Sequence, residues 1–124
     1  MTATGIEERS RVAAGAAHGK LAGIWCPVLT PVDQDLKPDA GRFARHARWL
    51  LDEGCHGLVV FGTTGEATSF AVDERIELLE AIVAAGLPRE RMLVGTGCCA
   101  LTDTVRLTRH ALSLGITGVL ALPP

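Results

Sequence analysis

Short apolar runs alternate with longer segments of helical periodicity from residue 21 onward. Four apolar runs fit buried strands, at residues 23–30, 58–61, 92–94 and 119–122. Pro27 interrupts the first run, and proline cannot donate a hydrogen bond to a neighbouring strand. The pattern therefore predicts four strands, of which the first is the least regular.

Three segments between these runs have helical spacing, and each ends at a glycine suited to a left-handed C-terminal cap. Asp39 is a good N-cap for the first segment, the second begins near Val72, and the third begins near Thr102. The glycines that close them are Gly54, Gly86 and Gly115. On the second helix, the apolar face is expected to consist of Ile76, Leu79, Ile82 and Val83.

Continuous apolar strands separated by helices indicate an α/β fold with a parallel sheet covered by helices. One strand and helix unit takes about 30 residues, and a closed barrel of eight units takes roughly 250 residues. The 124 residues hold about half of that, and the last apolar run leads into Pro123 without a following helix. We expect the first half of a TIM (β/α)8 barrel at residues 21–124, truncated or dependent on a partner.

Composition narrows the possible partners. The net charge is −2 with both signs interspersed, so no basic stripe exists to bind nucleic acid. No run approaches the roughly 20 apolar residues of a membrane span, and residues 1–20 lack the apolar core of a signal peptide. Residues 1–20 are rich in Ala, Gly and charge, which predicts a flexible arm. A cytoplasmic protein with a small-molecule partner is expected.

The second apolar run ends in Gly62, Thr63, Thr64, Gly65 and Glu66, which is the most informative segment of the chain. The two glycines are expected to let the backbone turn with positive φ and approach a ligand closely. Amide and hydroxyl donors on such a turn would bind a small anion such as a carboxylate. The alternative is that these residues only form a turn.

The cysteines and a glycine-rich segment give only weak evidence for metal or dinucleotide binding. The four cysteines have no C-x-x-C spacing, so they are expected to pack as small apolar residues, with no metal site. The segment from Gly95 to Ala100 fits a loose dinucleotide fingerprint, yet no acidic residue ends the following strand. We therefore expect no cofactor.

Several motifs together resemble the dihydrodipicolinate synthase and N-acetylneuraminate lyase family. They occur in the family's order: the run from Ile24 to Pro31 that ends in Thr-Pro, the segment Gly57 to Glu66, Glu74-Arg75, Gly95-Thr96-Gly97, and the last run into Pro123. The resemblance implies a TIM barrel that is a homo-oligomer when full length. It also implies a lysine that forms a Schiff base with pyruvate or another 2-oxo acid, followed by aldol condensation, cleavage or dehydration.

The resemblance assigns roles to the turn. Thr63 would act in a proton relay, and Thr64, Gly62 and Gly65 would bind the carboxylate of the 2-oxo acid. No metal or cofactor is implied.

The chain departs from the family pattern in ways that limit its activity. It contains no tyrosine, and its only lysines, Lys20 and Lys37, do not end a predicted strand. The family's Schiff-base lysine and its tyrosine lie on later strands, so this chain alone is expected to be inactive. Cys99 replaces an asparagine that is common in the lysine-biosynthesis synthases, which disfavours that substrate. The alternative is a noncatalytic half-barrel that binds a small carboxylate or a partner chain.

Overall fold

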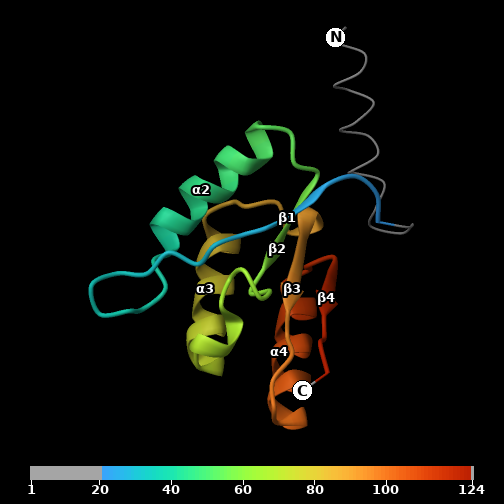
Figure 1. Ribbon diagram of the computed structural model, residues 1–124. Coiled ribbons are helices and arrows are strands. Elements are labelled where there is room, and N and C mark those ends of the chain that lie inside the picture. Colours follow the sequence, from blue (N-terminus) through green and yellow to red (C-terminus); the bar gives the residue numbers. More distant parts are fainter. Residues whose placement is uncertain (1–20, 124) are drawn as a thin grey trace, which may run out of the picture.

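A four-stranded parallel sheet forms the centre of the fold (Figure 1). The computed structural model describes residues 21–123, so the predicted arm at residues 1–20 lies outside the described residues. The strands lie side by side in chain order: β1 (Trp25–Pro27), β2 (Gly57–Val60), β3 (Met92–Gly95) and β4 (Gly118–Leu120). All neighbouring pairs are parallel, as predicted, so the carboxyl ends of the strands lie along one edge.

Three helices connect the strands: α2 (Ala40–Asp52), α3 (Val72–Ala84) and α4 (Leu101–Ser113). The side chain of Asp39 caps α2 by accepting a hydrogen bond of 3.0 Å from the amide of Arg42. Left-handed glycines follow all three helices, with φ of +107° at Gly54, +88° at Gly86 and +78° at Gly115. The helix ends predicted from these glycines are confirmed. Two short 3₁₀ turns, η2 (Ala67–Ser69) and η3 (Arg89–Arg91), complete the elements.

The first strand is shorter than the apolar run predicts. Residues 23–30 were expected to be extended, but only Trp25–Pro27 pair with β2. Pro27 stands opposite Val59 and has no amide to donate, and the amide of Val28 makes the next bond, 3.0 Å to the Val59 carbonyl. A strand at the edge of the described sheet tolerates this proline.

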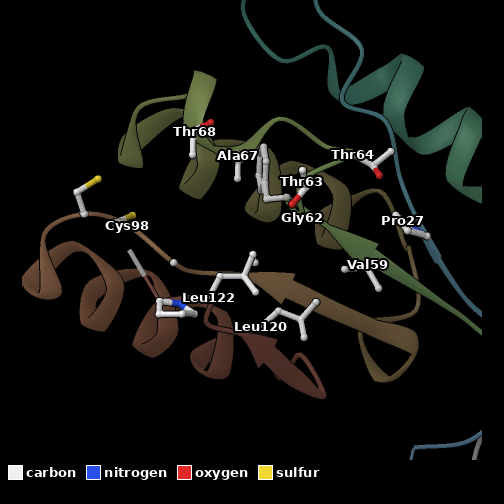
Figure 2. Close-up of a pocket in the computed structure, with 15 residues that line it drawn as sticks. Pro27, Val59, Gly62, Thr63, Thr64, Ala67, Thr68, Cys98, Leu120 and Leu122 are labelled. Atoms are coloured by element: carbon white, nitrogen blue, oxygen red, sulfur yellow. The ribbon is translucent and has the colours of Figure 1, made fainter.

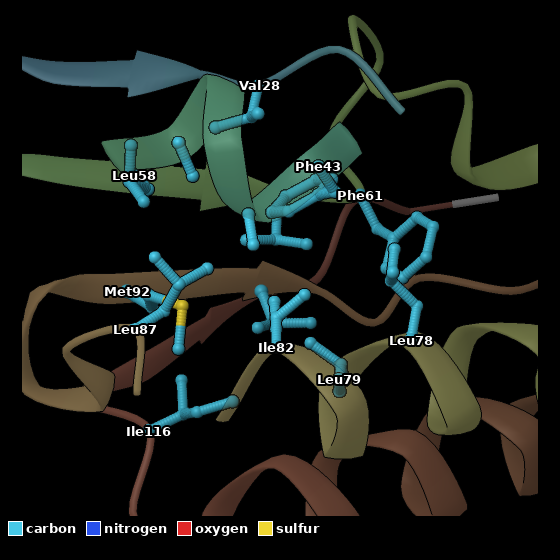
Figure 3. Packing of buried hydrophobic residues seen from close by; sticks show 14 of the residues in the cluster. Val28, Phe43, Leu58, Phe61, Leu78, Leu79, Ile82, Leu87, Met92 and Ile116 are labelled. Atoms are coloured by element: carbon cyan, nitrogen blue, oxygen red, sulfur yellow. The ribbon is translucent and has the colours of Figure 1, made fainter. Parts of the chain in front are cut away.

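The hydrophobic core lies between one face of the sheet and the three helices (Figure 3). Successive strand residues alternate between the two faces, so Leu58 and Val60 point toward the helices while Val59 points away. Burying one such side chain completely contributes roughly 1.5–3 kcal/mol. The largest fully buried apolar residues include Phe43, Phe61, Leu58, Leu79, Ile82, Met92 and Leu107.

The buried face of α3 differs from the prediction. Leu79 and Ile82 are fully buried as expected, but Ile76 is only partly buried. The structure buries Leu78 and the cation Arg75 in addition. The helix is therefore rotated about its axis relative to the prediction, which places a charged side chain against the sheet.

Within residues 21–123, no helix has the length and apolar character that crossing a bilayer requires.

Candidate active site

A pocket of about 620 Å³ lies on the sheet face opposite the helices, toward the carboxyl ends of the strands (Figure 2). The turn after β2 forms one side of it, and residues of β4 and beyond face this turn. In parallel sheets covered by helices, ligands bind at this end of the strands. The lining comprises Pro27, Val59, Phe61, Gly62, Thr63, Thr64, Ala67, Thr68, Gly95, Gly97, Cys98, Cys99, Leu120, Leu122 and Pro123.

The Gly62 to Gly65 segment is a tight turn that is anchored to β1. The amide of Glu66 donates a 3.0 Å hydrogen bond to the carbonyl of Thr63, which places Thr64 and Gly65 at the corners. The hydroxyl of Thr30, which follows β1, donates a 2.7 Å hydrogen bond to the carbonyl of Gly65. These bonds give the turn a defined position at the edge of the pocket.

The expected conformation of the two glycines is wrong. Gly62 and Gly65 do not have positive φ; the left-handed residues are Phe61, with φ of +54°, and Glu66, with φ of +53°. Gly65 is needed for close packing instead, because a Cβ there would lie 3.0 Å from the Val28 carbonyl oxygen and 3.1 Å from the Phe61 nitrogen. The glycine lets the turn lie directly on the backbone beneath it.

The two threonines of the predicted anion-binding turn, Thr63 and Thr64, line the pocket (Figure 2). Both residues are exposed, and within residues 21–123 neither hydroxyl bonds to another protein group. Such groups are available to donate to a carboxylate or to pass a proton. Thr68 also lines the pocket, and no sequence motif singles it out, because it follows the turn in a short 3₁₀ segment.

The loop after β3 supports the pocket by packing against the end of β4. The amide of Thr96 donates to the carbonyl of Leu120 at 2.9 Å, and the Thr96 side chain is buried against Thr108. A Cβ at Gly97 would lie 3.1 Å from the carbonyl oxygen of Leu122. Thr96 and Gly97 therefore pack against the end of β4.

The cysteines lie at both ends of the sheet. Cys98 and the exposed Cys99 line the pocket, whereas Cys26 and Cys55 lie near the amino end of β2. Burial, and then the neighbouring thiol of Cys26, raise the pKa of the Cys55 thiol above its ordinary value. No three His, Cys, Asp or Glu side chains of the described part of the chain gather to hold a metal ion.

Thiol labelling is expected to separate these cysteines. Only the thiolate reacts with iodoacetamide, so the raised pKa of Cys55 predicts slow labelling at neutral pH that accelerates only as the solution becomes more alkaline. Exposed Cys99 is expected to react first. Peptide mass spectrometry after short pulses across a pH series measures both rates, and Cys26→Ser should speed the labelling of Cys55. Equal rates for Cys55 and Cys99 at neutral pH would contradict the expectation.

The chain is similar to proteins of one family over its described length. Residues 20–124 match the model of the dihydrodipicolinate synthetase family. An uncharacterized DapA-like lyase of Chloroflexus aurantiacus is 44% identical over 103 residues, covering 82% of this chain and 34% of the relative.

Solved structures agree with this match. Dihydrodipicolinate synthase from Agrobacterium tumefaciens superimposes with a TM-score of 0.78 at 32% identity, covering 82% of this chain and 36% of that protein. YagE of Escherichia coli K12, a prophage protein of the same family solved in complex with pyruvate, gives a TM-score of 0.72 at 27% identity, covering 83% of this chain and 35% of that protein.

These matches confirm the predicted fold class, a partial TIM barrel with four parallel strands and three helices. The chain spans about a third of the length of the relatives that it matches. The 20–124 match includes the turn, the pocket walls and all four strands. The chain belongs to the dihydrodipicolinate synthetase family.

Proposed function

We propose that this chain is the amino-terminal part of a lyase that acts on pyruvate or another 2-oxo acid through a Schiff base. The observation that carries the proposal is the turn after β2, where Thr63 and Thr64 direct free hydroxyls into a pocket at the carboxyl ends of parallel strands. The pyruvate complex of YagE, a protein of similar fold, supports a 2-oxo acid as ligand.

Each residue of the turn has a proposed task. The Thr64 hydroxyl and the backbone amides of Gly62 to Gly65 bind the substrate carboxylate, because donors fixed in advance stabilise an anion without reorganising. Thr63 passes a proton between the reacting centre and a proton-donating group. Leu120 and Leu122 form an apolar wall of the pocket that faces these polar groups.

The Schiff-base lysine is proposed to come from a segment beyond this chain. Within residues 21–123 the one lysine, Lys37, is exposed in the loop between β1 and α2 and does not line the pocket. A lysine and a tyrosine on later strands would complete the site, which fits relatives about three times as long. We also propose that the complete protein is a cytoplasmic homo-oligomer.

Trapping with borohydride tests the proposal. Borohydride reduces an imine between pyruvate and a lysine to a stable amine, so the full-length product of the gene should gain the mass of the reduced adduct on one lysine. The 124-residue chain by itself should gain none and show no turnover. A full-length protein that forms no adduct with pyruvate or a related 2-oxo acid would refute the proposed mechanism.

A noncatalytic half-barrel that binds a small carboxylate or a partner chain is the second candidate. It is favoured by the absence of any lysine from the pocket lining within residues 21–123. The coding DNA after the Pro124 codon discriminates between the two. A reading frame that continues into a tyrosine and a strand-borne lysine supports the lyase, while an immediate stop supports the binding module.

A further inference from the structure

Arg75 of α3 is a cation that the fold has buried behind the pocket. Its exposed fraction is 2%, and its Nη2 donates a 2.6 Å hydrogen bond to the carbonyl of Gly95, the last residue of β3. Its Nη1 donates to the Sγ of Cys98 at 3.3 Å. One side chain therefore holds both the end of β3 and the loop that follows it.

The surroundings of this guanidinium offer no carboxylate. Within residues 21–123 no Asp or Glu oxygen lies within 4.0 Å of an Arg75 nitrogen, and its buried Nε has no hydrogen-bond partner. The remaining contact is with the ring of Phe61, whose centroid lies 5.6 Å from the guanidinium carbon. Burying a charge without a counter-ion costs free energy. The carbonyl of Gly95, the thiol of Cys98 and the ring of Phe61 are therefore the groups that stabilise the guanidinium.

Phe61 connects this arrangement to the turn. It immediately precedes Gly62, and its φ of +54° is unfavourable for an aromatic residue unless the surroundings enforce it. The ring is enclosed by Phe70, with centroids 5.8 Å apart, and by Arg75. The backbone of Phe61 also lies against Gly95, where a Cβ would be 1.9 Å from the Phe61 carbonyl oxygen.

We propose that Arg75 is a positioning residue that fixes the Gly62 to Gly65 turn relative to the loop after β3. It touches no lining hydroxyl; it acts by clamping the carbonyl of Gly95 and the ring of Phe61, from which the turn departs. The effect on substrate rests on the proposed function, whereas the effect on the two loops does not.

Arg91 provides a matched control. Its Nε donates to the carbonyl of His56 at 2.8 Å and its Nη2 to the carbonyl of Cys55 at 2.7 Å. These contacts resemble those of Arg75 chemically, but they lie at the amino end of β2, away from the pocket. Arg91→Met therefore removes a guanidinium from backbone carbonyls without touching the loops of the site.

Kinetics of the full-length protein test the substrate effect. Arg75→Met is expected to raise KM for pyruvate about tenfold, because small displacements of binding groups cost large factors. Arg75→Lys keeps the charge and places hydrogen-bond donors on a single nitrogen, so it should restore part of the loss. Arg91→Met should lower Tm and leave KM within about twofold. Unchanged KM in both Arg75 variants, or the same rise in Arg91→Met, would overturn the proposal.

Labelling of Cys98 tests the loop effect without any turnover. In a Cys99→Ser background and at about pH 10, where an ordinary thiol is already largely thiolate and the rate reports access rather than ionisation, iodoacetamide should label Cys98 several-fold faster in Arg75→Met than in the parent or in Arg91→Met, because the loop that carries Cys98 is no longer held by Arg75. A protein without lyase activity that shows this difference would refute the proposed function and retain the role of Arg75. Equal labelling in the parent and in both Arg75 variants would refute that role.

Discussion

Replacing Gly95 with alanine is expected to destabilise the protein by about 3 kcal/mol and to distort the pocket. The added Cβ would lie 1.9 Å from the carbonyl oxygen of Phe61 and 2.7 Å from its carbonyl carbon. Both are backbone atoms, so no side-chain rotation relieves the contact. Either β2 and β3 must separate or the turn after Phe61 must move, and the first of these breaks the centre of the sheet.

Gly41→Ala is the control for this substitution. Gly41 is exposed on α2, and the nearest atom to a Cβ there is an Asp39 carboxylate oxygen at 3.5 Å, an ordinary contact. Alanine in a helix lowers the entropy of the unfolded chain, so this variant should gain about 0.5 kcal/mol. Urea unfolding of the two full-length variants measures both changes. A Gly95→Ala protein as stable as its parent would show that the backbones do not approach this closely.

The regular elements could be predicted from sequence because local signals agree with one another there. Asp39 begins α2, and the left-handed glycines Gly54, Gly86 and Gly115 follow the three helices, as periodicity and capping rules predict. Their conformations depend on neighbours within a few residues. The parallel order of the strands also follows from apolar runs that alternate with helices.

The turn was located correctly but explained incorrectly. Gly62 and Gly65 suggested left-handed backbone, whereas the structure gives that conformation to Phe61 and Glu66. The need for glycine at Gly65 arises from the backbone of Phe61, four residues earlier, and from the carbonyl of Val28, which is far away in the sequence. Local rules identify a glycine as special without showing whether its φ or its lack of a side chain is used.

The burial of Arg75 also could not be predicted from local sequence rules. Hydrophobic periodicity assigns apolar residues to the core, so it cannot place a cation there. The groups that contact the Arg75 guanidinium belong to Phe61, which follows β2, and Gly95, which ends β3. The only sequence signal was the motif Glu74-Arg75, which resemblance to the family highlighted without giving it a role.

The turn on one side of the pocket could be located from the sequence, whereas the opposite wall could not. The ends of parallel strands share an edge, so the position of Thr63 and Thr64 follows from strand order alone. Predicting the apolar wall formed by Leu120 and Leu122 would require knowing how the segment after β4 packs against the loop after β3. That packing depends on tertiary contacts with no counterpart in local pattern.

If the proposed function holds, Thr63→Val is expected to lower kcat of the full-length protein by about 100-fold or more, because a positioned proton-transfer group contributes on the order of 10²–10⁴ to a rate. Valine keeps the branched shape of threonine and removes the hydroxyl. The hydroxyl of exposed Thr63 makes no hydrogen bond to other described residues, so stability should change little. Steady-state kinetics with pyruvate and an aldehyde acceptor provide the measurement. Thr63→Ser, which restores a hydroxyl, should recover most of the rate.

Variants of Thr64 and Thr68 show whether the effect of Thr63→Val reflects proton transfer or substrate binding. Thr64→Val should raise KM for pyruvate about tenfold with a smaller effect on kcat, since it removes the proposed donor to the carboxylate in both ground and transition states. Thr68→Val, which alters the pocket lining outside the turn, should leave both constants within about twofold. If Thr63→Val instead raised KM with kcat intact, its hydroxyl would belong to the carboxylate site, and the proton relay would have to run through another group.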